Sequence, residues 1–469
     1  MLFLAEYIQG SAMRKLLFFI LVSSFLISAN AQSRFSKQQV AEDLEELKDL
    51  LINANYNAYA YTAKAEFDSV YDGLRPEIKT DSLNFLKTTN LFQRMVDVVK
   101  MGHTSIPFPA QSYIEYVSGG GTVFPLELTF EDDKTFVRKN WSATEALRPG
   151  TEILSINGMP MPEVLAKLHP YVAGEREYLK NAKIELFSFP RIYWQVFGAV
   201  PSFQVEALQD GKSVLVEVPA VAGISGYESL RNETLDGVQD FRFIQNKAYM
   251  KLGSFSGDEE QFKAFVDSAF TEIRNTKTDT LILDLRNNSG GNDSQSDYLL
   301  SYIADRPFRW NSAFSLKTSK ALKEHVRSER DTTAAFWKEA LTHADGEIYD
   351  YAFEPYEPKP EEQRFTGTVY ALINRQSHSQ AAVTASQLQD YGWATLVGEE
   401  TGDYPSLYAS VFYVKLPQTG IVVQLSKGKS LRVNGSDAEE GVIPDLKIRD
   451  HLLDDEDEIL DGLLHVLSR

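Results

Sequence analysis

The sequence predicts a multi-domain protein with an α/β core, and its length, its composition and the order of its patterns each point to this class. A chain of 469 residues exceeds one ordinary hydrophobic core, and at roughly 150 residues per domain it is long enough for two or three. Its 43% hydrophobic and 24% charged residues exclude collagen-like and disordered chains. In the second half, strand-like and helical runs alternate, which favours a layered α/β structure.

The charge balance and the absence of cysteine exclude several kinds of function. With 47 Lys and Arg against 66 Asp and Glu, the net charge is -19, which repels a phosphate backbone. Nucleic acid is therefore not expected as a partner. The chain has no cysteine, so disulfides, thiol catalysis and thiolate metal sites are excluded.

The N-terminus has the pattern of a cleavable secretory signal. Arg14 and Lys15 precede an apolar run over residues 16–27, and Ala29 and Ala31 offer the small residues that a signal peptidase reads. The run is shorter than the roughly 20 residues that a spanning helix needs. We therefore expect a signal peptide over residues 1–31, no integral membrane segment after its removal, and an extracytoplasmic location, periplasmic or secreted.

Residues 32–110 are expected to form an N-terminal helical domain, because apolar residues recur there at three- and four-residue spacing. Residues 111–225 change to short alternating strands, with Asp210-Gly211 as a hairpin turn between two of them. Within that region, residues 147–158 follow the order turn, strand, turn, and a short helix follows. This order resembles a PDZ domain.

The third region, residues 240–469, contains the predicted α/β core. Residues 306–366 interrupt it with a charged segment that we predict to be a largely helical arm. The core elements are strands at residues 249–252, 280–285 and 369–373, and helices at residues 260–274, 293–303 and 381–391.

Ser379 lies between the predicted strand at residues 369–373 and the predicted helix at residues 381–391. A serine at such a junction most often caps the helix through its hydroxyl. The other interpretation is a nucleophile, because a helix N-terminus offers unpaired N–H groups and partial positive charge to a developing oxyanion. The local sequence alone favours the cap.

A wider pattern favours the nucleophile. Five segments appear in one order: Gly102-His103-Thr104, the PDZ-like segment, LILDLRNNSGG at residues 281–291, residues 374–401, and GVIPD at residues 441–445. From about residue 35 to the C-terminus, the chain resembles the tail-specific, or C-terminal processing, serine proteases, whose core is shared with the tricorn protease and a retinoid-binding protein. The resemblance implies a crotonase-like α/β serine protease core and polypeptide substrates.

The resemblance also implies roles for individual residues. It places the nucleophile at Ser379, and the oxyanion hole at the amides of Gln380 and of Gly290 or Gly291. A glycine-rich turn after a buried strand suits this role, since backbone N–H groups can approach a substrate closely there. The family's catalytic lysine is missing, because Tyr404 stands at its position.

A histidine is therefore the expected base. His103 stands at the position of the family's histidine, whereas the side chain of His378, next to Ser379, is expected to point away from it. The resemblance to tricorn-like relatives offers Glu439 or Glu440 to orient the base, and the alternative is that both are solvated carboxylates.

Two departures from the family pattern, Met101 and Ala382, leave open a catalytically inactive homologue that binds peptides or apolar ligands on the same fold. An esterase would need a Gly-x-Ser-x-Gly elbow, which Ser379 lacks. The seven histidines show no metal-ligand spacing, and no cofactor motif is complete. The sequence thus predicts a secreted serine endopeptidase without metal or cofactor, and it does not predict an oligomeric state.

Overall fold

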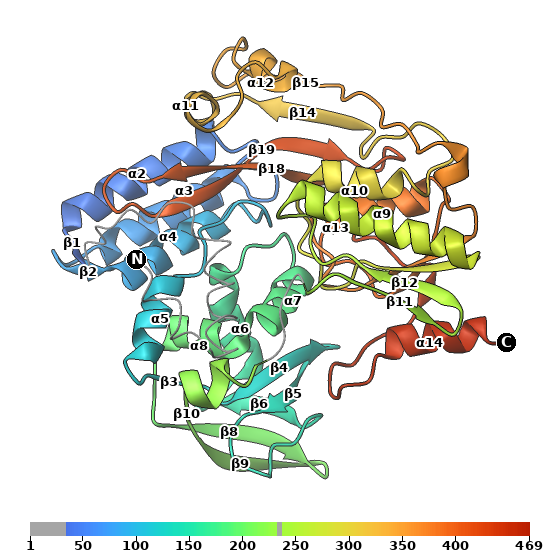
Figure 1. The fold of residues 1–469 in the computed structure, drawn as a ribbon. Helices are drawn as coiled ribbons and strands as arrows, with labels where there is room; N and C mark the ends of the chain where they lie inside the picture. The colour runs from blue at the N-terminus through green and yellow to red at the C-terminus, as the bar shows by residue number, and fades with distance from the viewer. Residues whose placement is uncertain (1–33, 232–236) are drawn as a thin grey trace, which may run out of the picture.

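The computed structural model describes residues 34–231 and 237–469, and the predicted signal peptide lies outside these ranges. The described chain combines helices with several sheets, which confirms the predicted multi-domain α/β class. Figure 1 shows the N-terminal helices beside the hairpin β18–β19, a β module below them, the α/β core opposite, and an arm across the top.

The N-terminal helices do not have a hydrophobic core of their own. They are α2 (Lys37–Asn53), α3 (Lys64–Leu74), α4 (Phe85–Asp97) and α5 (Ala110–Ser118), with the short strands β1 (Arg34–Phe35) and β2 (Leu83–Asn84) pairing between them. A capping box formed by Ser36 and Gln39 begins α2. The buried faces of α2, α3 and α4 share one cluster with Phe412 and Leu425 of the hairpin and Leu322 of the arm. This packing fixes the segment after α4 against the C-terminal half of the chain.

The β module is an antiparallel sheet with helices packed on it. Its strands β4 (Leu126–Glu131), β5 (Lys134–Asn140), β6 (Glu152–Ile156), β8 (Ser202–Gln209) and β9 (Lys212–Pro219) lie in that order, and β7 (Met159–Pro160) pairs with β6. The predicted hairpin is present, since Gln209 pairs with Lys212 and both Asp210 and Gly211 have positive φ. The helices are α6 (Met161–Leu168), α7 (Glu177–Phe187) and α8 (Phe189–Phe197), and β3 (Thr122–Val123) pairs with β10 (Val221–Ala222).

The core is a six-stranded sheet, parallel except at one edge. Its order is β11 (Asp240–Ile244), β12 (Lys247–Lys251), β13 (Thr280–Asp284), β16 (Thr368–Ile373), β17 (Thr395–Gly398) and β20 (Leu446–Lys447), with only β11 antiparallel to its neighbour. Helices α9 (Glu259–Thr276), α10 (Asp293–Leu300) and α13 (Gln380–Asp390) pack on one face, and α14 (Glu458–Leu467) packs on the other. Because β13 and β16 are parallel neighbours, the loops that follow them meet at one edge of the sheet.

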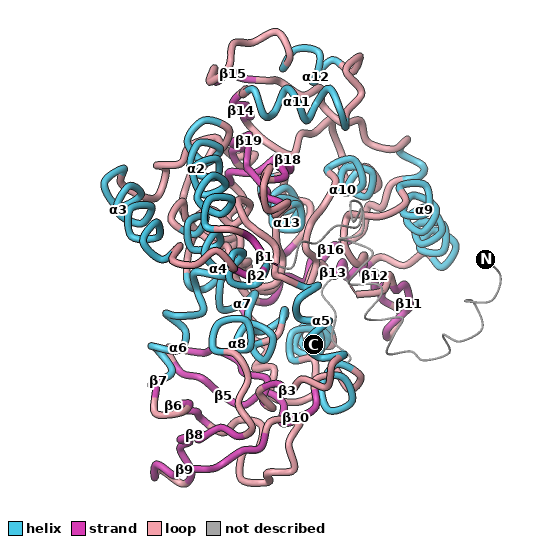
Figure 2. Tube along the Cα trace, turned by 90° about the vertical axis from the view of Figure 1, so that its left-hand side faces the viewer, coloured by secondary structure: helices cyan, strands magenta, loops and turns pink. Residues whose placement is uncertain are grey.

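The prediction of a largely helical arm was wrong. Residues 306–366 contain two short helices, α11 (Lys320–Glu329) and α12 (Ala335–Ala340), and two strands, β14 (Ala313–Lys317) and β15 (Ile348–Asp350). Those strands join β18 (Leu407–Lys415) and β19 (Val422–Leu431) in a four-stranded sheet of order β15-β14-β19-β18. A local pattern does not reveal a pairing with strands about 100 residues away. Figure 2 shows this sheet rising from the N-terminal helices to the arm.

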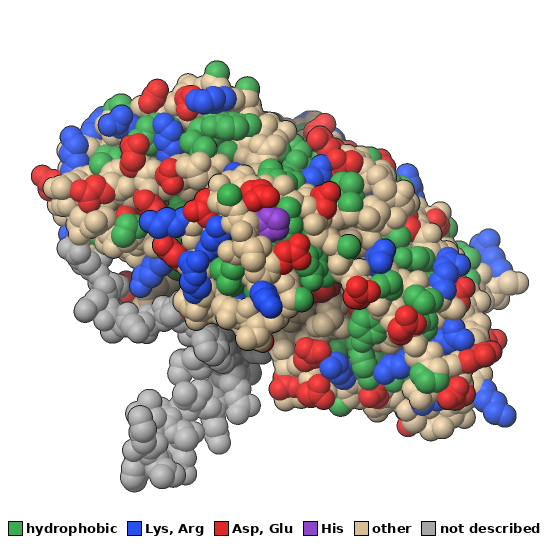
Figure 3. Space-filling view, turned by 90° about the horizontal axis from the view of Figure 1, so that it is seen from above, with side chains coloured by type: hydrophobic (Ala, Val, Ile, Leu, Met, Phe, Trp, Pro, Cys, Tyr) green, Lys and Arg blue, Asp and Glu red, His purple; other side chains and the backbone are tan. Residues whose placement is uncertain are grey.

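Within residues 34–231 and 237–469, no helix has the length and apolar composition that crossing a membrane requires. On the face drawn in Figure 3, acidic and basic side chains are interspersed rather than gathered into a continuous basic surface.

Candidate functional site

Ser379 stands between β16 and α13 with an unusual backbone conformation. Its φ of 54° and ψ of -125° are sparsely populated for a residue with a side chain. Its hydroxyl makes no capping hydrogen bond to α13, so the cap interpretation fails. Its N–H donates instead to Asp403 Oδ2 at 2.8 Å. The hydroxyl of the half-buried Ser379 is therefore not engaged in capping α13.

Ser377, two residues earlier, has a structural role. Its side chain is fully buried, and its hydroxyl donates to the Leu285 carbonyl at 2.8 Å and accepts the Asn374 N–H at 3.1 Å. These bonds fasten the loop after β16 to the end of β13. The two neighbouring serines thus differ clearly in what their hydroxyls do.

Asp403 lies beside Ser379, His103 and His378, and it is not among the site residues expected from the sequence. It is fully buried, and its Oδ2 atom lies 3.3 Å from His378 Nε2 and 3.8 Å from His103 Nε2. The two imidazole rings stack with centroids 4.8 Å apart and planes at 19°. One carboxylate oxygen is thus shared by two histidines and by the N–H of Ser379.

His103 reaches this cluster because β19 holds its segment. Ser105 and Gln424 exchange backbone hydrogen bonds of 3.0 and 2.8 Å, and Gln424 Nε2 donates to the His103 carbonyl at 2.9 Å. Next to them, Thr104 Oγ1 donates to Asn55 Oδ1 at 2.7 Å, in the loop after α2. The predicted approach of His103 to Ser379 therefore depends on contacts more than 300 residues apart in sequence.

His378, which the sequence analysis expected to point away from Ser379, belongs to this cluster. Its side chain lies against His103 and Asp403. The expectation assumed alternating side chains, which requires extended backbone. The chain turns at Ser379 instead, and the His378 N–H donates to the Asn288 carbonyl at 3.0 Å.

Burial sets the protonation of the site. It lowers the pKa of His103, and it lowers the pKa of His378 to about 3, although Asp403 opposes both changes. Burial would raise the pKa of Asp403, but the two histidines and Lys183 hold that pKa below its usual value. The cluster at neutral pH therefore contains a carboxylate and two neutral imidazoles, each able to accept a proton.

No hydrogen bond joins Ser379 and His103 in this structure. Both ring nitrogens of His103 are buried and have no hydrogen-bond partner within the described chain. The two residues meet through the shared Asp403 oxygen. Catalytic hydrogen bonds often tighten only when substrate binds, so the arrangement is compatible with a base that engages the hydroxyl later.

The predicted oxyanion donors lie beside the serine. A Cβ added to Gly290 would come within 2.6 Å of both the Gln380 N and the Ser379 Cβ, so only glycine allows this approach. The Gly290 N–H, however, already donates to Asn288 Oδ1 at 2.8 Å. Within the described chain, the Gly291 N–H has no such acceptor, and the Gln380 N–H is at the open start of α13.

Glu439 and Glu440 are exposed, and within the described chain neither forms an ion pair or a hydrogen bond with a histidine. The carboxylate next to the histidines belongs to Asp403. Met101 is buried in the N-terminal core, and Ala382 is buried inside α13.

The β module contributes two further charged groups. Glu175, just before α7, accepts the Gly102 N–H through Oε1 at 2.6 Å, and its Oε2 atom is buried without a hydrogen-bond partner in the described chain. Lys183 on α7 donates to the Ala173 carbonyl at 2.8 Å and to the Gly102 carbonyl at 3.4 Å. The N–H and the carbonyl group of Gly102, the residue before His103, thus both form hydrogen bonds with the β module.

Glu175 gives a prediction about stability. Burial, with a smaller contribution from Asp403, raises its pKa from 4.5 to about 7. Because the folded protein holds this proton more tightly than the unfolded chain, the contribution of Glu175 to stability falls as pH rises between these values. Glu175→Gln keeps an acceptor for the Gly102 N–H without the titrating group. We expect the free energy of unfolding of the variant, relative to the wild type, to increase from about pH 5 to about pH 8.

Urea denaturation at the two pH values measures this difference. Glu177→Gln is the matched control, because that side chain is 83% exposed on the same segment and should leave the pH dependence unchanged. A difference between Glu175→Gln and the wild type that does not vary with pH would contradict the prediction.

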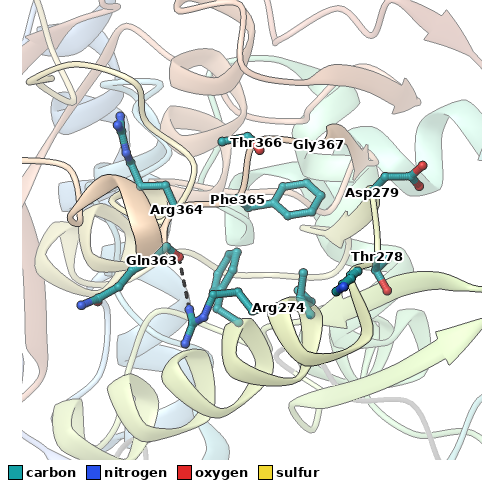
Figure 4. Close-up of a pocket in the computed structure, with 11 residues that line it drawn as sticks. Arg274, Thr278, Asp279, Gln363, Arg364, Phe365, Thr366 and Gly367 are labelled. Carbon is teal, nitrogen blue, oxygen red and sulfur yellow. Dashed lines mark hydrogen bonds between the residues drawn. The ribbon is translucent and has the colours of Figure 1, made fainter.

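A cavity of about 380 Å³ lies elsewhere, at the C-terminal end of α9. Figure 4 shows Arg274 donating to the Gln363 carbonyl at its rim, with Phe365 behind. None of the candidate catalytic residues lines it. The cavity is therefore separate from the cluster around Ser379.

Comparison with known proteins gives one family match. Residues 246–448 match the model of peptidase family S41. This segment includes Ser379, His378, Asp403 and the turn at Gly290, whereas His103 and Glu175 lie before it. No curated protein matches the sequence.

Solved structures with similar folds cover most of the chain. Mature CPAF is 16% identical, with a TM-score of 0.57, and the match covers 87% of this chain and 93% of that one. Mature CPAF complexed with lactacystin gives 16% identity, a TM-score of 0.58, and coverage of 87% and 94%. The photosystem II D1 C-terminal processing protease is 16% identical with a TM-score of 0.45, over 92% and 97% of the two chains. At these identities, the likeness to CPAF concerns the fold.

Proposed function

We propose that this chain, which belongs to peptidase family S41 through residues 246–448, is a serine peptidase in which Ser379 is the nucleophile and His103 is the base. One observation carries the proposal. The strained Ser379 leaves its hydroxyl out of the helix cap, while its N–H shares the Asp403 oxygen with the imidazoles of His103 and His378.

The first chemical step is attack by Ser379 Oγ on the scissile carbonyl carbon, with transfer of the hydroxyl proton to His103. His103 suits this role better than His378 because of its ring nitrogens. His378 has its Nδ1 3.4 Å from the Ser289 carbonyl and its Nε2 near Asp403, so both of its nitrogens face acceptors. His103 has only its Nε2 near Asp403, which leaves Nδ1 for the serine.

Asp403 orients the histidine and stabilises the imidazolium that forms when the proton arrives. In this proposal Asp403 has the role of orienting the base, which we expected of Glu439 or Glu440. Its negative charge raises the pKa of His103 against the effect of burial, which makes proton acceptance easier.

The oxyanion of the tetrahedral intermediate would accept hydrogen bonds from the N–H groups of Gln380 and Gly291. Gly290 could serve only if the Asn288 carboxamide released its N–H. Removing one such donor typically costs about 10²–10³ in kcat, so two fixed donors can supply a large part of the acceleration. His103 then returns its proton to the leaving amine, and water releases the acyl group.

The substrates of this proposal are polypeptides, as the family match implies. The signal-like pattern at residues 1–31 supports action in an extracytoplasmic space. The order of elements at residues 147–168 supports a PDZ-like role for the β module, in which a peptide would bind by strand addition. Its helix α7 carries Lys183, which donates to the Gly102 carbonyl, so the module contacts the residue next to the proposed base.

Labelling with a fluorophosphonate tests the proposal, because this reagent modifies activated serines without requiring a known substrate. We expect one adduct, located by peptide mass at Ser379. Ser379→Ala should remain unlabelled, whereas Ser377→Ala, which removes a structural hydroxyl, should still be labelled if it folds. No adduct in the folded wild-type protein, or an adduct elsewhere that persists in Ser379→Ala, would overturn the proposal.

A further inference from the structure

His103, His378 and Asp403 form a set of donors suited to a metal ion. One ligand atom from each of the three residues lies within 4.8 Å of the other two. Sequence spacing did not indicate such a site, because the three residues come from a loop after α4, a helix start and a loop before β18. Two imidazoles and one carboxylate are donors that Zn²⁺ commonly uses.

One of the two distances from Asp403 agrees with a tetrahedral ion, and the other is longer. Bonds of about 2.0–2.1 Å at tetrahedral angles place two ligand atoms about 3.3–3.4 Å apart. Asp403 Oδ2 lies 3.3 Å from His378 Nε2 and 3.8 Å from His103 Nε2. The three ligand atoms lie within 4.8 Å of one another, and a shift of the His103 side chain would shorten the longer distance to Asp403. The rings, now stacked at 19°, would have to turn so that both lone pairs meet at one point.

The donors are also buried and short of partners. The Nε2 atoms of His103 and His378 are buried without hydrogen-bond partners in the described chain, a costly state for a polar atom. Burial favours the neutral imidazoles that a metal requires. Asp403 is already oriented by the N–H groups of Ser379, at 2.8 Å, and Tyr404, at 3.1 Å, as ligating carboxylates usually are.

We propose that His103, His378 and Asp403 bind a divalent transition-metal ion, with Zn²⁺ the best fit, and that this ion reversibly blocks the reaction at Ser379. The binding itself follows from the donor geometry, and only the block rests on the proposed function. A bound ion would take the imidazole lone pairs and hold Asp403, so that His103 could not accept the serine proton. Water would complete the fourth position.

Calorimetric titration of Zn²⁺ into the full mature chain tests the binding. Ser379→Ala serves as the host protein, because it keeps all three donors and removes the proposed nucleophile. We expect one site of micromolar or tighter affinity. His378→Ala and His103→Ala, each introduced into this host, should weaken it by about 100-fold or more, since each removes one of three ligands. The visible absorption of Co²⁺ added to the host should show a four-coordinate ion.

The chain offers a matched control. His451 lies in another group of possible ligands, with Asp450 and Glu458. His451→Ala should leave the affinity unchanged, and loss of binding in that variant would overturn the proposed site. So would the absence of any binding to the host, or six-coordinate Co²⁺ spectra together with unchanged affinity in His378→Ala and His103→Ala.

Labelling of the wild-type protein tests the block. Zn²⁺ at saturating concentration should slow fluorophosphonate labelling of Ser379 by at least about 10-fold, and a chelator should restore it. Undiminished labelling with the site saturated would overturn the block. A protein that is not labelled even without metal would refute the proposed function instead, while the titration would still decide the metal site.

Discussion

Replacing His103 by alanine should lower the rate of fluorophosphonate labelling, and of hydrolysis of an unfolded polypeptide, by about 10⁴-fold or more. The physical reason is the loss of the imidazole that, of the two beside Asp403, has a ring nitrogen free of a neighbouring acceptor. Without it, the hydroxyl of Ser379 must attack with its proton in place, or transfer that proton to water.

His378→Ala is the informative comparison. His378 stacks on His103 and shares Asp403 with it, so its loss should loosen the base and lower the rate by only about 10–100-fold. Both variants remove an imidazole of the same size, and thermal unfolding shows whether their effects on stability are similar. A larger loss of rate in His378→Ala than in His103→Ala would exchange the roles of the two histidines.

Asp403→Asn should lower the same rates by about 10³–10⁴-fold. The amide keeps the size of the carboxylate but loses its negative charge. In the wild type, that charge favours the protonated form of His103. Removing that charge should also lower the pKa of His103, so the fall in rate on acidification should shift to lower pH. Rates of labelling measured across pH give both quantities.

Asp297→Asn provides the matched control. Asp297 is also buried under α13, where it accepts a hydrogen bond from Gln387 Nε2 at 3.2 Å, and burial raises its pKa to about 7. It has no histidine beside it, so its replacement should leave the rate nearly unchanged. Equal losses in the two variants would show that Asp403 acts only by supporting the helix start.

Much of the fold could be predicted from local patterns. The strand at β13, the strand at β16 and the helix α13 appear where periodicity placed them, because each element buries a face whose spacing matches its own geometry. The arm was mispredicted, since β14 exists through pairing with β15 and with the distant β19. Elements stabilised by distant partners have no local signal.

The site was predictable in part. Its serine and its first histidine were nominated through a family resemblance, and their catalytic roles stay predictions. Asp403 had one weak signal, because it directly precedes Tyr404, the position at which the resemblance led us to expect the family lysine. Glu175 had none, because its significance depends on a hydrogen bond to Gly102 from a separate module.

The sequence by itself determined the α/β class, the positions of the core strands and the serine at the start of α13, because short-range periodicity and turn chemistry are written along the chain. Only the tertiary structure decided which acid meets the histidines and where the side chain of His378 points. Those facts depend on the backbone turn at Ser379 and on the contact of residue 105 with residue 424. Hydrogen bonds and buried charges act over a few ångströms in space, whatever the separation in sequence.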